Sequence, residues 1–175
     1  MRPTLPYEGH YLILIMEKLR IHDLDHQFKD ELAREPGCQH LQRCFSCGVC
    51  TAVCPVSAIE PDFSPSRILR QIIYGLRGEL LASPSLWYCL SCAQCSFQCP
   101  QDVRFLDIIQ GLRHLAVREG LIHPDQADRC RQAETLLLQL RRRLLANILA
   151  QPDRTEALTT LMLEIAQDLA TNEAS

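Results

Sequence analysis

Apolar residues recur every three or four positions over several stretches of the chain, which is the pattern of amphipathic helices. One predicted helix begins at Ser64-Pro65, a good N-cap residue followed by proline, and ends at Gly78. A second is capped by Asp102 and closed by Gly120. Their apolar faces comprise Ile68, Leu69, Ile72, Ile73 and Leu76 in the first helix and Phe105, Leu106, Ile109, Leu112, Leu115 and Ala116 in the second.

The two ends of the chain show similar periodicity. Near the N-terminus an apolar run over residues 11–16 is compatible with a strand or a helix, and a short helix follows, with Asp23 as N-cap and Pro36-Gly37 at its end. A long helix is predicted over residues 125–149, and after the break at Pro152-Asp153 comes a last amphipathic helix. Their apolar positions are Leu24, Phe28 and Leu32 in the short helix, Leu136, Leu137, Leu140, Leu144, Ile148 and Leu149 in the long one, and Leu158, Leu161, Met162, Ile165 and Leu169 in the last. We therefore expect a mainly α-helical fold.

Two cysteine quartets of identical spacing interrupt this helical pattern. They are Cys44-x2-Cys47-x2-Cys50-x3-Cys54-Pro55 and Cys89-x2-Cys92-x2-Cys95-x3-Cys99-Pro100, offset by 45 positions. Thiolates at every third residue of a tight loop can bind three corners of one cubane, while the fourth is carried onward and turned away by proline. Bacterial two-cluster ferredoxins use this spacing, and there the fourth cysteine ligates the other cluster. The pattern thus predicts two [4Fe-4S] clusters, one held by Cys44, Cys47, Cys50 and Cys99 and the other by Cys89, Cys92, Cys95 and Cys54.

Zinc and disulfides are the alternative uses of so many cysteines. Structural zinc prefers two CxxC pairs separated by a spacer, which fits four cysteines within eleven residues poorly. A disulfide scaffold is typical of short secreted chains, whereas 175 residues suffice for a core without cross-links. Cys38 and Cys130 lie outside the repeated spacing, and we interpret both as structural.

Charge and composition narrow the class of partner. A formal net charge of -3 disfavours nucleic-acid binding, which needs a basic face. The apolar run over residues 11–16 is far shorter than the ~20 residues of a membrane span, and no signal peptide frames it. We expect a cytoplasmic protein without a membrane span. The chain also contains no GxGxxG or P-loop glycine pattern, so no dinucleotide or triphosphate site is predicted.

Each quartet is followed by proline and then by an apolar helix, so the quartets and helices form an internal repeat that favours pseudo-twofold packing. The predicted domains are an N-terminal extension with a short helix (1–37), a two-cluster α-helical domain of ferredoxin type (38–120) and a C-terminal helical extension (121–175).

The central part resembles the C subunit of heterodisulfide reductase and its relatives. The resemblance rests on the doubled CxxCxxCxxxCP, the 45-residue offset, the Ser-Pro-Ser-Arg-Ile helix between the quartets and the approach from Glu79 to Cys89. It covers roughly residues 38–120, about half of the chain. It implies an all-helical subunit that relays electrons between an A-type subunit, which carries flavin and iron–sulfur clusters, and a catalytic B-type subunit.

The resemblance also implies that this chain has no catalytic residues. In that family the B subunit reduces the disulfide and has cluster motifs with adjacent cysteines, and no Cys-Cys pair occurs here. Two other functions stay open: the iron–sulfur subunit of another oxidoreductase, such as a quinone-linked dehydrogenase, and a structural protein whose metal only holds helices together.

Overall fold

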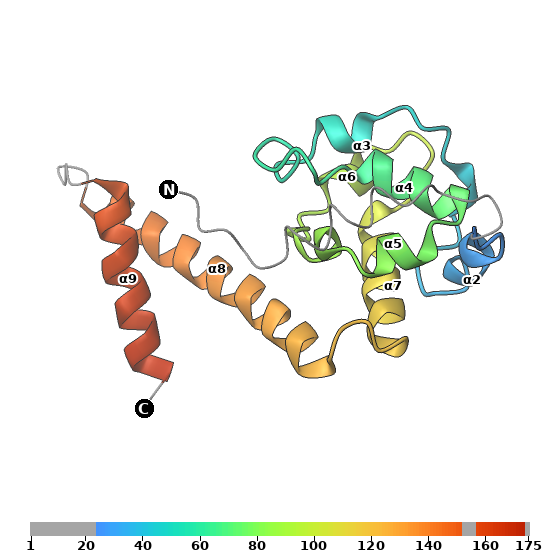
Figure 1. Cartoon of the computed structure of the whole chain (residues 1–175). Helices are drawn as coiled ribbons and strands as arrows, with labels where there is room; N and C mark the ends of the chain where they lie inside the picture. The colour runs from blue at the N-terminus through green and yellow to red at the C-terminus, as the bar shows by residue number, and fades with distance from the viewer. Residues whose placement is uncertain (1–23, 152–156, 174–175) are drawn as a thin grey trace. The chain divides into compact units, whose positions relative to one another are not determined.

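The computed structural model of the chain describes residues 24–151 and 157–173 (Figure 1). These residues form α-helices, 3-10 helices and loops, with no strand among them, which confirms the mainly α-helical fold. The predictions for residues 11–16, for Asp23 and for the break at Pro152-Asp153 lie outside the described residues. The chain divides into two compact units, Met1–Leu115 and Ala116–Ser175.

The first unit contains the cysteines and consists of short elements. They are α2 (Phe28–Leu32), η2 (Leu41–Arg43), α3 (Val49–Ala52), α4 (Pro65–Tyr74), α5 (Arg77–Leu81), η3 (Pro84–Trp87), α6 (Gln94–Phe97) and most of α7 (Phe105–Arg118). Helix α3 contacts both α4 and α6, and α4 contacts α2 and α5. The core side chains come mainly from α4 and α7, and among the fully buried ones are Ile72, Ile108, Ile109 and Leu112. A helical framework thus surrounds the two cysteine loops.

Helix α4 begins as predicted but ends earlier than predicted. The Ser64 hydroxyl accepts a hydrogen bond from the backbone N–H of Arg67, and Pro65 starts the helix. The helix ends at Gly75, which has a φ of +78°, whereas the sequence pattern predicted Gly78. A Cβ at Gly75 would lie 2.4 Å from the backbone oxygen of Asp25. The close approach of a distant segment, and the left-handed backbone, therefore require glycine at this position.

The N-terminal helix is shorter than its apolar pattern suggests. Helix α2 spans only five residues, yet Phe28 and Leu32 on its inner face are fully buried, as expected. Arg77 holds this segment against α5: its Nη1 lies 3.0 Å from Oδ2 of Asp25 and 2.6 Å from Oε2 of Glu31. Its guanidinium also lies over the ring of Phe28.

Helix α7 ends where the sequence predicted but is not capped by Asp102. The helix starts at Phe105, three residues beyond Asp102, and both Asp102 and Arg104 have left-handed backbones. Asp102 binds Nδ1 of His40 instead, through its carbonyl at 2.9 Å and its carboxylate at 3.1 Å. At the other end Gly120, with a φ of +71°, closes the helix as predicted. The His40 contact joins the segment before the first quartet to the segment after the second.

The second unit contains α8 (Pro124–Ala150) and α9 (Leu158–Glu173), which pack against each other (Figure 1). Leu161, Ile165 and Leu169 of α9 are buried, and Leu140 and Leu144 of α8 pack against them. Other leucines of the predicted apolar stripes are exposed, including Leu137, Leu149 and Leu158. The two helices therefore bury one narrow face and leave further apolar surface uncovered.

Candidate metal centre

The two cysteine loops have the same backbone shape. In each, the residue before the second cysteine and the residue after it have left-handed φ values: Ser46 and Gly48 in the first loop, Ser91 and Ala93 in the second. A four-residue helix follows each loop, α3 after the first and α6 after the second. Left-handed residues turn the chain sharply, so three successive thiols can face one centre. The internal repeat of the sequence is thus also a repeat of backbone conformation.

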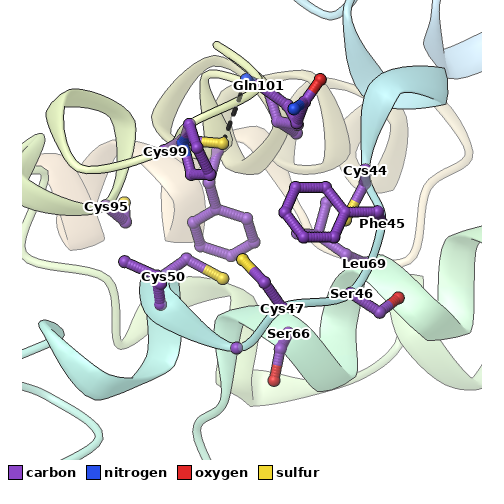
Figure 2. A pocket seen from close by; sticks show the side chains of 15 residues that line it. Cys44, Phe45, Ser46, Cys47, Cys50, Ser66, Leu69, Cys95, Cys99 and Gln101 are labelled. Atoms are coloured by element: carbon purple, nitrogen blue, oxygen red, sulfur yellow. Dashed lines mark hydrogen bonds between the residues drawn. The ribbon is translucent and has the colours of Figure 1, made fainter.

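The first loop forms a cavity together with the last cysteine of the second quartet. The cavity measures about 430 Å³ including its open mouth, and its cysteines are Cys44, Cys47, Cys50, Cys95 and Cys99. Figure 2 shows the sulfur atoms of Cys44, Cys47, Cys50 and Cys99 turned toward the same space. These are the four thiols that the sequence assigns to one cluster.

The second loop forms a similar cavity with the last cysteine of the first quartet. This cavity measures about 330 Å³ and is lined by Cys54, Cys89, Cys92 and Cys95. Burial is the main cause of the raised pKa of Cys89 and of Cys95, and the charge of Cys54 adds to it. The fourth cysteine of each quartet therefore lies with the first three of the other.

The two cavities are neighbours. Cys95 and Phe105 line both of them, so a single cysteine and a single aromatic ring form part of each wall. A side chain of similar position also lies at each mouth: Phe45 follows the first cysteine of its quartet, and Leu90 follows the first cysteine of the other. Phe45 is 59% exposed and Leu90 is 51% exposed. Both mouths are thus bordered by apolar surface that a partner can approach.

Burial raises the pKa of three of the cavity thiols. Loss of solvent is the main cause for Cys50, Cys89 and Cys95, and neighbouring thiols add to it, with the pKa of Cys95 reaching about 11. Without metal these thiols are protonated at neutral pH. Because a metal binds the thiolate, loading the site must release protons.

The chemistry of the cavities fits iron–sulfur clusters. In the described residues no three His, Cys, Asp or Glu side chains converge closely enough to hold a single metal ion. Each cavity is instead lined by at least four cysteines, whose thiolates are the ligands of [4Fe-4S] clusters. The backbone N–H of Val103 donates a hydrogen bond to Sγ of Cys99 at 3.4 Å (Figure 2). Hydrogen bonds of this kind to ligand sulfurs help to set the potentials of iron–sulfur clusters.

Two buried hydroxyls belong to residues that are next in sequence to residues lining the second cavity. The hydroxyls of Ser91, beside Cys92, and of Ser57, three residues after Cys54, have no hydrogen-bond partner among the described residues. A buried polar group without a partner is unfavourable by about 1–3 kcal/mol. The sulfur atoms of a cluster bound in the second cavity would be hydrogen-bond acceptors for the hydroxyls of Ser57 and Ser91.

Arg113 is a residue near the site that the sequence analysis missed. It lies in α7, is only 5% exposed, and donates to the backbone oxygens of Leu86 and Cys89. The signal was visible in the sequence: Arg113 follows Ile109 by four positions and precedes Ala116 by three, so it lies on the apolar face of its helix.

Cys38 and Cys130 lie outside both cavities. Cys38 is fully buried against α7, where its thiol donates to the backbone oxygen of Asp107 at 3.4 Å. Burial and the charges of Asp107 and Glu35 raise its pKa to about 12. Cys130 lies in α8 and is partly exposed. Neither lines the cavities formed by the other eight cysteines.

Comparison with known proteins identifies the central segment. Residues 43–104 match the family described as 4Fe-4S dicluster domain. The C subunit of H(2):CoB-CoM heterodisulfide,ferredoxin reductase from Methanothermobacter thermautotrophicus is 31% identical over 106 residues, which cover 61% of this chain and 56% of that protein. An iron–sulfur C subunit of CoB--CoM heterodisulfide reductase from Methanocaldococcus jannaschii is 36% identical over 80 residues, or 46% of this chain and 42% of that protein.

A third relative gives the same picture. The C subunit of the ferredoxin/F(420)H(2)-dependent CoB-CoM heterodisulfide reductase of Methanosarcina acetivorans is 39% identical over 85 residues, which cover 49% of this chain and 52% of that protein. The chain thus spans about half the length of the curated relatives it matches. None of the described helices is both long enough and apolar enough to cross a bilayer. The resemblance seen in the sequence is confirmed: the cysteine-bearing part of this chain is α-helical and is similar to 4Fe-4S dicluster domains and to the C subunits of heterodisulfide reductases.

Proposed function

We propose that this chain is the electron-transfer subunit of a heterodisulfide-reductase-like complex and that it holds two [4Fe-4S] clusters. The observation that carries the proposal is the pair of adjoining thiol-lined cavities, each lined by the first three cysteines of one quartet and the last cysteine of the other, with Cys95 shared. A related arrangement underlies the two-cluster ferredoxins. The relatives named as C subunits support the assignment to such a complex.

In this proposal Cys44, Cys47, Cys50 and Cys99 hold the first cluster, and Cys89, Cys92, Cys95 and Cys54 hold the second. A bound [4Fe-4S] cluster accepts and returns one electron at a time. The protein keeps the two sites adjacent through Cys95 and Phe105, which line both cavities. The apolar side chains Phe45 and Leu90 border the mouths and offer partner subunits a dry contact surface. The chain positions the clusters and performs no bond chemistry of its own.

The proposed partners are an A-type subunit with flavin and iron–sulfur clusters and a catalytic B-type subunit, in the cytoplasm. The iron–sulfur subunit of another oxidoreductase is the alternative that shares the same site. Purification of the tagged chain from its own host distinguishes them. Recovery of a flavoprotein together with a cysteine-rich B-type subunit supports the proposal, whereas recovery of a membrane-anchored quinone reductase contradicts it.

The cluster content is tested on the purified chain. Anaerobic reconstitution should give about eight iron and eight sulfide per chain, with EPR signals of two reduced [4Fe-4S] clusters. The crossed ligation has its own test, because Cys54→Ala should perturb the same EPR signal as Cys92→Ala and a different one from Cys47→Ala. If Cys54→Ala and Cys47→Ala alter one common signal, each quartet binds its own cluster. Zinc or [2Fe-2S] centres at full occupancy contradict the assignment altogether.

A further inference from the structure

Arg113 is a buried cation placed directly behind the second cysteine loop. Its Nε donates to the backbone oxygen of Leu86 at 2.9 Å, and its Nη2 donates to the backbone oxygen of Cys89 at 3.1 Å. Cys89 is the first cysteine of the loop and lines the second cavity. The guanidinium therefore contacts a residue that is a proposed cluster ligand.

The surroundings of Arg113 keep its charge away from water. Arg113 is 5% exposed, and its guanidinium carbon lies 5.2 Å from the centre of the Trp87 ring, which covers it. A charge away from water acts through a lower effective dielectric, so its influence on nearby charges is larger than that of a surface arginine. In agreement, the charge of Arg113 acts to lower the pKa of the Cys89 thiol, against the larger raising effect of burial.

Burial distinguishes Arg113 from the arginine near the end of the second quartet. Apart from the thiols, the residues that line the two cavities are uncharged. Arg104 is 53% exposed and lies 3.8 Å from Asp102 and 3.7 Å from Asp107, whereas Arg113 is 5% exposed. Solvent therefore screens the charge of Arg104 more strongly than that of Arg113.

A cluster that accepts one electron gains one unit of negative charge, and a nearby buried cation stabilises that charge. We propose that Arg113 raises the reduction potential of the cluster held by Cys89, Cys92, Cys95 and Cys54, and raises it by more than the potential of the other cluster. The inference rests on the proposed function, because it needs both clusters in place. Reduction by a one-electron donor then adds an electron to this cluster, while Arg113 stays protonated and no bond is formed or broken. Cluster charge, hydrogen bonds and burial are the known determinants of such potentials.

The test is a potentiometric titration of the reconstituted full chain, followed by EPR, with the second cluster identified as the signal altered in Cys92→Ala. In Arg113→Gln the ratio of reduced to oxidised second cluster, measured at the wild-type midpoint potential, should fall about tenfold. This corresponds to a midpoint potential lower by ~59 mV for a one-electron couple. The midpoint of the first cluster should shift by clearly less. Arg113→Lys, which retains the charge, should recover most of the loss, and Arg70→Gln, the same charge change on the exposed face of α4, should have no effect.

Trp87→Leu provides a second measurement if Arg113→Gln binds iron incompletely. Removal of the ring opens Arg113 to water, so the potential of the second cluster should fall, by less than in Arg113→Gln. Equal midpoints in wild type, Arg113→Gln and Trp87→Leu, or equal shifts of both clusters, overturn the role of Arg113. A wild-type chain without two [4Fe-4S] signals overturns the proposed function instead, and with it the inference.

Discussion

At the scale of single residues, the cysteine loops depend on backbone conformations that most residues avoid. Glycine occupies the left-handed position after the second cysteine of the first quartet, at Gly48, whereas the equivalent position of the second quartet is Ala93. An L-residue in this region is disfavoured by about 1–2 kcal/mol because its Cβ approaches the backbone. The second loop thus contains local strain, which the surrounding structure maintains.

Exchange of these two residues should change stability in opposite directions. A Cβ at Gly48 meets no atom within 4 Å, so Gly48→Ala adds only backbone strain and should destabilise the protein by about 1 kcal/mol. Ala93→Gly should relieve strain and stabilise by about 0.5–1 kcal/mol, less the extra freedom of the unfolded chain. Thermal unfolding of the anaerobic holoprotein measures both, and a shift of ~2–4 °C per kcal/mol is expected. Destabilisation by Ala93→Gly would contradict the strain argument.

The two remaining cysteines should differ in reactivity. Cys38 is fully buried and its pKa is about 12, whereas Cys130 is partly exposed. The thiolate is the reactive form, so iodoacetamide at pH 8 should modify Cys130 in the anaerobic holoprotein and spare Cys38. In denaturant both should react. Peptide mapping by mass spectrometry reads the result, and rapid native labelling of Cys38 would show that its site is open.

The raised pKa of Cys38 also predicts a pH dependence. Its ordinary pKa is 9.0, and folding raises it, so the folded state holds the proton more tightly than the unfolded state. The stabilisation is fully present below pH 9 and is lost as the pH rises from 9 through 12. The unfolding midpoint of wild type should therefore fall over this range relative to its value at pH 8, and Cys38→Ala should show a smaller fall.

Arg113 shows where reading of single residues from sequence fails. The repeated spacing predicted which cysteines line the same cavity, and their assignment as cluster ligands stays a prediction. The contacts of Arg113 with Leu86 and Cys89 bridge 27 and 24 positions of sequence. A single arginine on an apolar helix face indicates a buried charge but not its partners, which depend on tertiary packing.

At the scale of elements, local signals predicted the start of α4 at Ser64 and the end of α7 at Gly120, but missed the end of α4 and the start of α7. The cap at Ser64 was predictable because it acts within one turn. The end of α4 was not, since Gly75 and Gly78 are both able to end a helix by local rules. The choice depends on Asp25, whose backbone N–H donates to the oxygen of Gly75 at 2.9 Å. A contact between segments 50 positions apart thus overrides the local pattern.

The C-terminal helices carry a prediction about assembly. Leu161, Ile165 and Leu169 are buried within their own unit, but Leu138, Leu149 and Leu163 are 68%, 80% and 65% exposed. Large exposed apolar areas commonly mark interaction sites. A chain truncated after Gly120 keeps all of α7 and all proposed ligands, so it should bind both clusters but fail to co-purify with the complex.

Iron analysis measures cluster binding by the truncated chain, and affinity purification from the native host measures its assembly with the complex. Normal assembly of the shortened protein would show that these helices do not dock a partner. Loss of iron or precipitation would show that they mainly complete the fold of the first unit. Full-length protein purified in parallel is the control for both measurements.

At the scale of the whole molecule, the described residues form two thiol-lined cavities. The sequence contains no nucleotide-binding glycine motif. The pure chain should therefore accept electrons from dithionite, seen as bleaching of its visible absorption. It should neither reduce a disulfide nor oxidise NADH, because no site for either reaction is predicted. Turnover of either substrate by the chain alone would reveal an active site that these residues do not suggest.

The crossed pairing of the quartets also governs how the protein is made. One cavity needs Cys99 beside residues 44–50, and the other needs Cys54 beside residues 89–95, so neither exists while the ribosome has delivered only the first quartet. With the proposed ligands, iron insertion must wait until synthesis has passed the second loop. Clusters bound in this way close long loops of the same chain, as paired cross-links would, so their loading is coupled to folding of the first unit.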